Sequence, residues 1–279
     1  MNAGGAATVF ELHAIGGPWG RRLAPRRAWL DELAWPAGGE LLADDARAGL
    51  PLEIARAMWT QTAWSEYASA AAFAEIAAAL LACGAPIDLV AAAGDFVVDE
   101  LVHAEAAARV AGAVGGAVAL EVALDRLVRP PAARAPLAAA AELIVRTCCV
   151  GEALTVPMLK LSRQVAGAGL IADVLGRIVA DEASHAQLGW WFLDWAVPRL
   201  DDAARAELGR VAGGAIASFA PLLAGGCTGS GLGVVACTVY DPAFTAAVAR
   251  HVVRPLAARG IEIPADALAV VGAATAARA

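Results

Sequence analysis

The sequence predicts an all-α protein whose centre is a four-helix bundle, with additional segments and helices at both ends. Apolar residues make up 59% of the 279 residues, and many of them are alanine, the strongest helix former. Strand-favouring residues do not gather in alternating runs, as the strands of a half-buried sheet would. Short breaks that contain Gly and Pro separate the long helical stretches, which is typical of helices joined by turns.

These breaks divide the chain into three parts. Residues 1–50 contain several Gly and Pro residues, so we expect an irregular leader that packs on the bundle and holds one short helix over 27–33. Residues 51–198 form the bundle. Residues 199–279 form a helical extension of the same domain.

The first hairpin of the bundle consists of two helices. Pro51 suits the first position of a helix, and nothing breaks that helix before Cys83. After a turn at 84–86, Asp88 is a candidate N-cap for a second helix that runs to about Gly112. A long crossover then leads to the second hairpin.

The second hairpin also consists of two helices. The first covers 136–166, and we expect a kink at Pro157 because proline removes a backbone hydrogen bond. A turn at 167–169 leads to the last helix of the bundle, over 170–197, which Pro198 stops.

The C-terminal extension adds two further helices. One begins at Asp201, a residue that favours N-caps, and fades by Pro221. The other is expected to begin with Asp241 as its N-cap and to end near Gly260.

Composition argues against several classes of protein. The net charge of −7 comes without a basic stripe, so we expect no nucleic-acid partner. The N-terminus lacks a signal-peptide layout, and the longest charge-free stretch, 211–240, is broken by Pro221 and by glycines. We therefore expect no membrane span and a cytoplasmic location. The five cysteines include no Cys-x-x-Cys pair, so we expect reduced thiols rather than a disulfide framework.

The pattern Asp-Glu-x-x-His occurs twice in a chain that has only four histidines. On a helix, residues three apart share a face, so each Glu and His pair can point at one place. Two such pairs, joined by two carboxylates from partner helices, can hold two metal ions in the core of a bundle. The two copies are Asp99, Glu100 and His103, and Asp181, Glu182 and His185.

The position of the first turn selects one of the two missing carboxylates. Residues equally far from an antiparallel turn lie at similar heights in the two helices. Glu66 and His103 are equally far from the turn after Gly84, so Glu66 is expected to face the first motif. Glu75 lies more than two turns along the helix and is expected to be second-tier or structural.

The second turn selects the other carboxylate in the same way. Glu152 and Glu182 are equally far from Gly167, whereas Glu142 lies ten residues earlier and falls outside the site. Four carboxylates in an apolar core would repel one another and lose their hydration without a metal, and their charge matches two divalent cations. The expected metal-binding and catalytic set is Glu66, Glu100, His103, Glu152, Glu182 and His185.

Three further residues are expected beside the metal ligands. Asp99 and Asp181 each lie four residues before a histidine, where a carboxylate can accept the second ring N–H of its own His or of one across the bundle. Thr155 lies three residues after Glu152. It is either a proton-relay or outer hydrogen-bond donor, or a hydroxyl bonded to its own helix. Cys148 or Cys149 is close enough in sequence to touch the site, although a buried apolar role is the simpler interpretation.

With these positions placed, residues 51–197 resemble the ferritin-like di-iron carboxylate superfamily. The Asp-Glu-x-x-His form is most similar to the bacterial multicomponent monooxygenase hydroxylases and related di-iron oxygenases. The resemblance implies a four-helix bundle with two irons, bridged by carboxylates, that reacts with dioxygen or peroxide. It also implies that the Asp of each motif supports a ligand rather than binding metal.

Departures from the pattern narrow the choice within that superfamily. Ala107 stands where ribonucleotide reductase small subunits carry a radical-storing Tyr, and Gly189 occupies the equivalent place after His185. Ile178 stands where the arylamine N-oxygenases have a third His. The chain also lacks the Cys-rich module of rubrerythrin-type peroxidases.

We therefore expect a non-haem di-iron oxidoreductase, an oxygenase or oxidase, that uses dioxygen or peroxide to oxidise a small organic or carrier-bound substrate. Its cofactor would be two Fe, and its electrons would come from an external donor. A di-manganese catalase-like enzyme, with two Mn or a mixed Mn/Fe site, is one alternative. A non-enzymatic metal-binding or ferroxidase-like protein is another. The high apolar content further suggests a homodimer.

Overall fold

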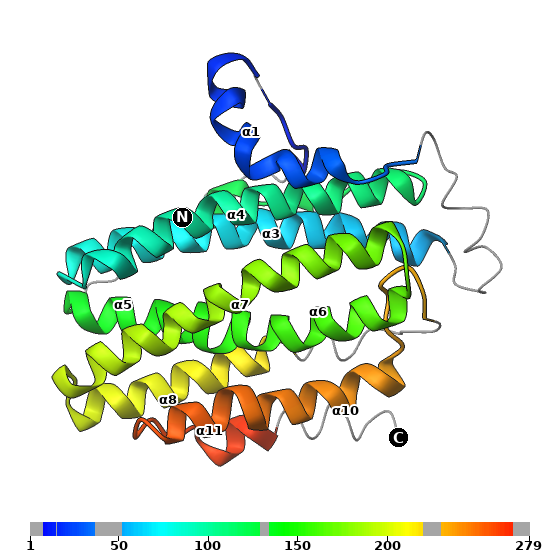
Figure 1. Cartoon of the computed structure of the whole chain (residues 1–279). Coiled ribbons are helices and arrows are strands. Elements are labelled where there is room, and N and C mark those ends of the chain that lie inside the picture. Colours follow the sequence, from blue (N-terminus) through cyan, green and yellow to red (C-terminus); the bar gives the residue numbers. More distant parts are fainter. Residues whose placement is uncertain (1–7, 15, 37–51, 129–133, 220–229, 270–279) are drawn as a thin grey trace.

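The computed structural model describes residues 8–14, 16–36, 52–128, 134–219 and 230–269, and this part of the chain is mostly helical (Figure 1). The prediction of an all-α protein is confirmed. Within these ranges the only sheet is a two-stranded antiparallel pair of β1 (Thr8–Val9) and β2 (Glu121–Val122), in which Thr8 lies opposite Val122.

The first hairpin consists of α3 (Leu52–Ala82) and α4 (Ile87–Ala113), which pack along their whole length (Figure 1). Most buried residues of α3 recur three or four positions apart, so they form one stripe along the helix. Glu66 is the one charged residue in this stripe. The stripe consists of Ala55, Trp59, Ala63, Glu66, Ala70, Phe73, Ile76 and Leu80.

The second hairpin has a composite first arm. This arm consists of α5 (Pro136–Ile144), a π-helical segment η3 (Val145–Glu152) and α6 (Ala153–Ala166), and α7 (Leu170–Ala196) returns beside it. Helix α4 packs on α7, and α5 packs on α3, so the two hairpins share a core.

Both hairpin turns fall where the sequence places them. Gly84 has a φ of 67° and Gly167 a φ of 74°, in the left-handed region that side chains with a Cβ rarely adopt. These turns set which residues of the paired helices lie at the same height.

Further elements cover both sides of the hairpins (Figure 1). Helix α1 packs on α4, whereas α8 packs on η3 and α10 packs on α6. The short 3₁₀ turns η2 and η4 follow β2 and α7, respectively. The bounds of these elements are Gly17–Glu32 for α1, Leu124–Arg126 for η2, Val197–Arg199 for η4, Asp202–Ala217 for α8, Cys237–Ala247 for α10, Val248–Val253 for η5 and Arg254–Ala257 for α11.

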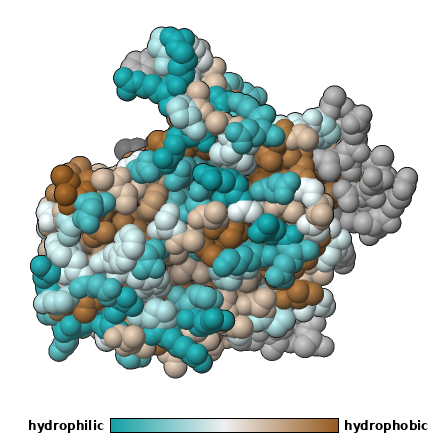
Figure 2. All heavy atoms as spheres, in the orientation of Figure 1, coloured by the Kyte–Doolittle hydropathy of each residue, from teal (hydrophilic) through white to brown (hydrophobic). Residues whose placement is uncertain are grey.

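On the face that Figure 2 shows, polar and apolar regions are intermixed. Among the exposed large apolar side chains are Leu81 and Ile87, which flank the turn of the first hairpin and are 68% and 84% exposed. Within the described ranges, no helix has both the length and the apolar character that crossing a membrane requires.

Some helix starts differ from the sequence-based prediction. The first helix begins at Gly17 rather than at residue 27, because Pro18 lies in the first turn, where its missing N–H costs nothing. Helix α4 begins before Asp88, whose carboxylate accepts a hydrogen bond from the N–H of Leu89 instead of capping the helix. The start predicted at Pro51 lies outside the described residues.

The C-terminal extension gives one confirmed and one wrong N-cap. Asp201 caps α8 and accepts a hydrogen bond from the N–H of Ala204 at 2.7 Å. Asp241 was expected to cap the next helix but lies within α10, which begins at Cys237. Tyr240, in the added turn, stacks on the buried Phe244, and this packing favours the longer helix despite the backbone hydrogen bond lost at Pro242.

The cysteines differ in state. Cys83, Cys148 and Cys149 are free thiols, as expected. Cys237 is disulfide-bonded, so the expectation of reduced thiols was wrong for this residue.

Adjacent leucines at the end of α3 test the packing of the first hairpin. Leu80 is fully buried and Leu81 is 68% exposed. We expect Leu80→Ala to lower the free energy of unfolding by about 2–5 kcal/mol, because it leaves a cavity. Leu81→Ala should lower it by less than about 0.5 kcal/mol. Urea denaturation of the metal-free protein, followed by circular dichroism, measures both, and equal effects would contradict this packing.

Candidate metal centre

The six predicted ligands come together between the two hairpins. Glu66 comes from α3, and Glu100 and His103 come from α4. Glu152 ends η3, while Glu182 and His185 come from α7. Every one of these residues is buried, with at most 7% of its surface exposed. The structure therefore assembles the whole set that was selected from motif spacing and turn positions.

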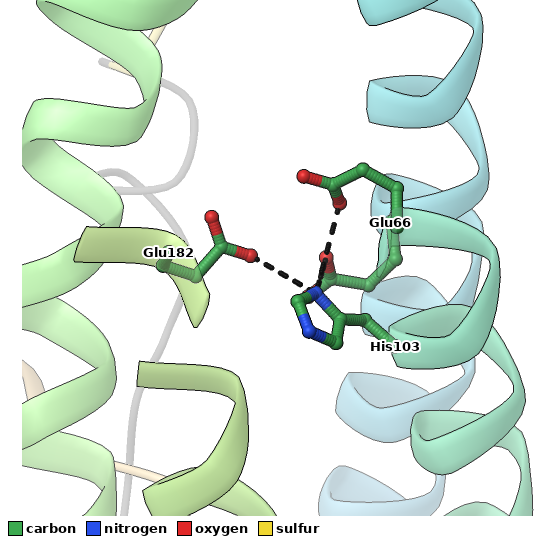
Figure 3. Close-up of side chains that lie close together, drawn as sticks. Glu66, His103 and Glu182 are labelled. Carbon is green, nitrogen blue, oxygen red and sulfur yellow. Dashed lines mark ion pairs between the residues drawn. The ribbon is translucent and has the colours of Figure 1, made fainter. Parts of the chain in front are cut away.

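The Nδ1 atom of His103 faces three carboxylates. It lies 3.2 Å from Oε1 of Glu182, 3.8 Å from Oε2 of Glu66 and 4.0 Å from Oε2 of Glu100. Figure 3 shows Glu66 and His103 on one side of this space, with Glu182 pointing at them from the other.

The Nδ1 atom of His185 is placed in the same way. It lies 2.8 Å from Oε1 of Glu100 and 2.9 Å from Oε2 of Glu182. Glu100 and Glu182 therefore each face both imidazoles. In each carboxylate, one oxygen lies towards His103 and the other towards His185.

Two overlapping groups of side chains could each hold a metal ion. The first consists of Glu66, Glu100, His103 and Glu182, and the second of Glu100, Glu152, Glu182 and His185. Within each group, the candidate ligand atoms lie within 4.8 Å of one another. Glu100 and Glu182 belong to both groups, whereas Glu66 and Glu152 each belong to one.

Asp99 and Asp181 each contact the histidine of the opposite helix rather than the one on their own helix. Oδ2 of Asp181, on α7, lies 3.3 Å from Nε2 of His103, on α4. Oδ2 of Asp99, on α4, lies 3.6 Å from Nε2 of His185, on α7. The sequence left open whether each Asp serves its own His or the other, and the structure selects the crossed arrangement. A carboxylate at Nε2 favours the tautomer whose Nδ1 is free to bind metal.

Each of these two aspartates also forms an ion pair with an arginine. Nη2 of Arg26, on α1, lies 2.6 Å from Asp99, and Nε of Arg177 lies 3.2 Å from Asp181. The ion pair between Arg26 and Asp99 connects the N-terminal helix to the histidine environment. Motif spacing gave no signal for either arginine.

Burial and mutual repulsion hold protons on some of the carboxylates. Burial, followed by the charge of Glu182, raises the pKa of Glu100 and Glu152 well above the usual value. The same two causes raise the pKa of Glu66 to about 6. Burial also acts on Glu182, but hydrogen bonds from His103 and His185 outweigh it and lower its pKa.

The histidines are strongly basic in the metal-free protein. Burial disfavours the charged form of His103, but hydrogen bonds with Asp181 and Glu182 outweigh it and raise its pKa to about 10. For His185, interactions with Asp99, Glu100 and Glu182 likewise outweigh burial and raise the pKa to about 12. Protons therefore occupy the positions that a cation would take.

The potential ligand atoms are better suited to binding a metal ion than to hydrogen bonding with one another. Both oxygens of Glu100 and Nδ1 of His103, all of which face the centre, are buried without a hydrogen-bond partner of suitable geometry among the described residues. Such unsatisfied buried atoms are costly in a folded protein. Carboxylate oxygens with imidazole nitrogens form a donor set that suits iron, manganese and zinc.

The π-helical segment that presents Glu152 packs unusually close to α7. A Cβ atom at Gly189 would lie 2.7 Å from Sγ of Cys149 and 2.8 Å from Cβ of Cys148. A side chain at 189 would therefore push η3 away from α7. π-helical turns are frequent at functional sites, but the sequence was interpreted here as ordinary α-helix.

The other candidates lie outside the two ligand groups. The hydroxyl of Thr155 donates to the carbonyl of Gly151 at 3.0 Å, which is the helix-bonded arrangement. Cys148 and Cys149 are buried, and burial raises the pKa of both thiols, so they remain protonated. Glu142 pairs with Arg134, away from the centre.

We compared the chain with protein-family models, with curated proteins and with solved structures, and none of the three comparisons gave a match. The interpretation of the site therefore rests on its residues and their geometry.

Gly189→Ala tests the close contact between α7 and η3. We expect the added methyl group to lower the free energy of unfolding by about 1–3 kcal/mol through overpacking, and to weaken metal binding by displacing Glu152. Gly94, in α4, is a matched control because nothing lies within 4 Å of its added Cβ. Gly94→Ala should raise stability by up to about 1 kcal/mol. Thermal unfolding and Mn²⁺ titration measure the two effects. A Gly189→Ala variant with unchanged stability and unchanged Mn²⁺ affinity would contradict the close contact.

Metal binding should release protons. The pKa values of His103 and His185, about 10 and about 12, lie above neutral pH, so both rings carry protons that a cation must displace. Affinity for Mn²⁺ should therefore rise from about pH 6 to about pH 8, with release of about two or more protons per chain. Calorimetry in buffers of different ionisation enthalpy counts these protons. Binding without proton release would contradict the assignment of the histidines as ligands.

Proposed function

We propose that the protein is a non-haem di-iron oxidoreductase built on a ferritin-like four-helix bundle. It would use dioxygen or peroxide to oxidise a small organic or carrier-bound substrate. The observation that carries the proposal is the overlap of the two ligand groups in Glu100 and Glu182. Carboxylates that face both histidines are the residues expected to bridge two metal ions.

Charge balance supports two divalent ions. Four ionised carboxylates contribute four negative charges, and two neutral imidazoles contribute none, so two divalent cations neutralise the set. A single cation would leave net negative charge in a site where every ligand is buried, and uncompensated buried charge is strongly unfavourable.

The protein residues have separate roles in this proposal. Glu100 and Glu182 would bind both ions. Glu66 and His103 would complete the coordination of one ion, and Glu152 and His185 that of the other. Asp181 accepts a hydrogen bond from Nε2 of His103, and Asp99 lies beside Nε2 of His185, so each carboxylate would orient the Nδ1 atom of its histidine towards the centre. Iron ions, when bound, would supply the electrons that reduce dioxygen or peroxide. An external donor would restore those electrons.

The neighbouring residues favour oxidation of a separate substrate over storage of a radical. Ala107 and Gly189 lie near the histidines in sequence, and both are buried in α4 and α7. Neither residue has a side chain that can be oxidised, so neither can store a radical for another subunit.

Metal loading and oxygen reactivity test the proposal. Anaerobic loading with Fe²⁺ should give about two ions per chain, and exposure to dioxygen should change the optical spectrum. Glu152→Gln should reduce the stoichiometry to about one ion or fewer, because it removes a ligand from one group. Glu142→Gln, an identical change outside the centre, should leave it unchanged.

The outcomes of this experiment separate the alternatives. Rapid disproportionation of peroxide by the Mn-loaded protein, without reactivity of the Fe-loaded one, would indicate a catalase-like enzyme. Stoichiometric metal binding with neither reactivity would indicate a metal-binding protein. Fewer than one ion per chain under both loading conditions would overturn the metal centre itself.

A further inference from the structure

A cavity lies outside the metal centre, in a groove between α6, α7 and η5. Helix α6 is in contact with both α7 and η5, and Figure 1 shows α6 between α7 and the C-terminal helices. The cavity has a volume of about 390 Å³, which falls in the range of small-molecule sites. None of the six candidate ligands lines it.

Three basic side chains line this groove. Lys160 comes from α6, while Arg250 and His251 come from η5. Lys160 is the only lysine of the chain. The lining includes no Asp or Glu among the described residues, and none of the ion pairs found in the described part of the chain involves these three residues.

The positive charges act on one another within the groove. Burial, and then the charges of Arg250 and Lys160, lower the pKa of His251. An uncompensated cluster of this kind attracts an anion. A nearby arginine shows the contrast, because Arg259 pairs with Asp194 at 2.8 Å and is therefore already neutralised.

The remainder of the lining is apolar. Val156 and Pro157 contribute from α6, and Trp190 contributes from α7. Small residues, Ala153, Ala183 and Ala186, complete the wall and leave space between the helices. The groove thus combines a basic rim with an indole and aliphatic carbon, which suits a ligand that has both an anionic group and an apolar body.

We propose that the groove formed by α6, α7 and η5 binds a small amphipathic anion, in which a phosphate or carboxylate is attached to an apolar body. Lys160 and Arg250 hold the anionic group through charge-assisted hydrogen bonds. Trp190 packs against the apolar body. None of the six candidate metal ligands lines this groove, and the proposal does not depend on the function proposed above.

Calorimetry on the metal-free full-length protein tests this site with four probes. Phenyl phosphate and benzoate carry the anion and the ring, inorganic phosphate carries the anion alone, and benzyl alcohol carries the ring alone. We expect at least one of the two aromatic anions to bind more tightly than inorganic phosphate, and benzyl alcohol not to bind. The comparison of phenyl phosphate with benzoate identifies which anionic group the site prefers.

Variants assign the binding to the groove. Lys160→Gln and Arg250→Gln should each weaken binding of the preferred aromatic anion by about fivefold or more, since each removes a charged partner. Arg210→Gln, which makes the same charge change on α8, should alter it by less than about twofold. Trp190→Leu should weaken binding of the aromatic anion and leave inorganic phosphate unaffected. Thermal unfolding of each variant shows whether its fold is retained.

Three results would overturn the proposal. These are no binding of either aromatic anion at millimolar concentration, equal losses in Arg210→Gln and Arg250→Gln, and binding that is abolished by Glu152→Gln but unaffected by Lys160→Gln and Arg250→Gln. The last result would place the anion at the metal centre instead. Loss of metal binding with anion binding retained would overturn the metal centre and leave the groove intact.

Discussion

The structure depends on the burial of four carboxylates around two imidazoles at the contact between two helical hairpins. Helix packing excludes water from this place, and the excluded water would otherwise have stabilised the charges. Protons on the histidines, and on some of the carboxylates, compensate the charge in the metal-free chain. Bound cations would compensate it more completely, because they would contact the oxygens of Glu100 and the Nδ1 atom of His103, which have no hydrogen-bond partner among the described residues. The fold thus buries in its core a cluster of ionisable side chains that could hold a metal ion.

Regular helix geometry explains why so much of the site could be predicted. An α-helix has a fixed rise per residue, so once the turns are located at Gly84 and Gly167 the heights of residues in the paired helices follow. This argument identified Glu66 and Glu152, which no local motif marks. The helical class and the start of α8 at Asp201 were predicted from the same local rules of propensity and capping.

The features that sequence reasoning missed are set by contacts between elements. The four-residue spacing between Asp99 and His103 brings them to one face of α4, but it cannot decide which histidine the carboxylate contacts. The π-helical segment that ends at Glu152 packs closely against Gly189, and glycine in a helix has no unique structural meaning in the sequence. The start of α10 before Asp241 was missed because burial of the helix outweighs the local preference for an N-cap at that residue.

The crossed pairing of Asp99 with His185 and of Asp181 with His103 has a consequence for the relation between the two hairpins. Each hairpin supplies one lone glutamate, one Glu-His pair and one aspartate, and each aspartate is used by the other hairpin. The halves are therefore reciprocal, like the subunits of a dimer with an approximate two-fold axis through the centre. Neither half contains a complete histidine environment on its own. The centre is therefore an interface between two hairpins of one chain, and each hairpin completes the histidine environment of the other.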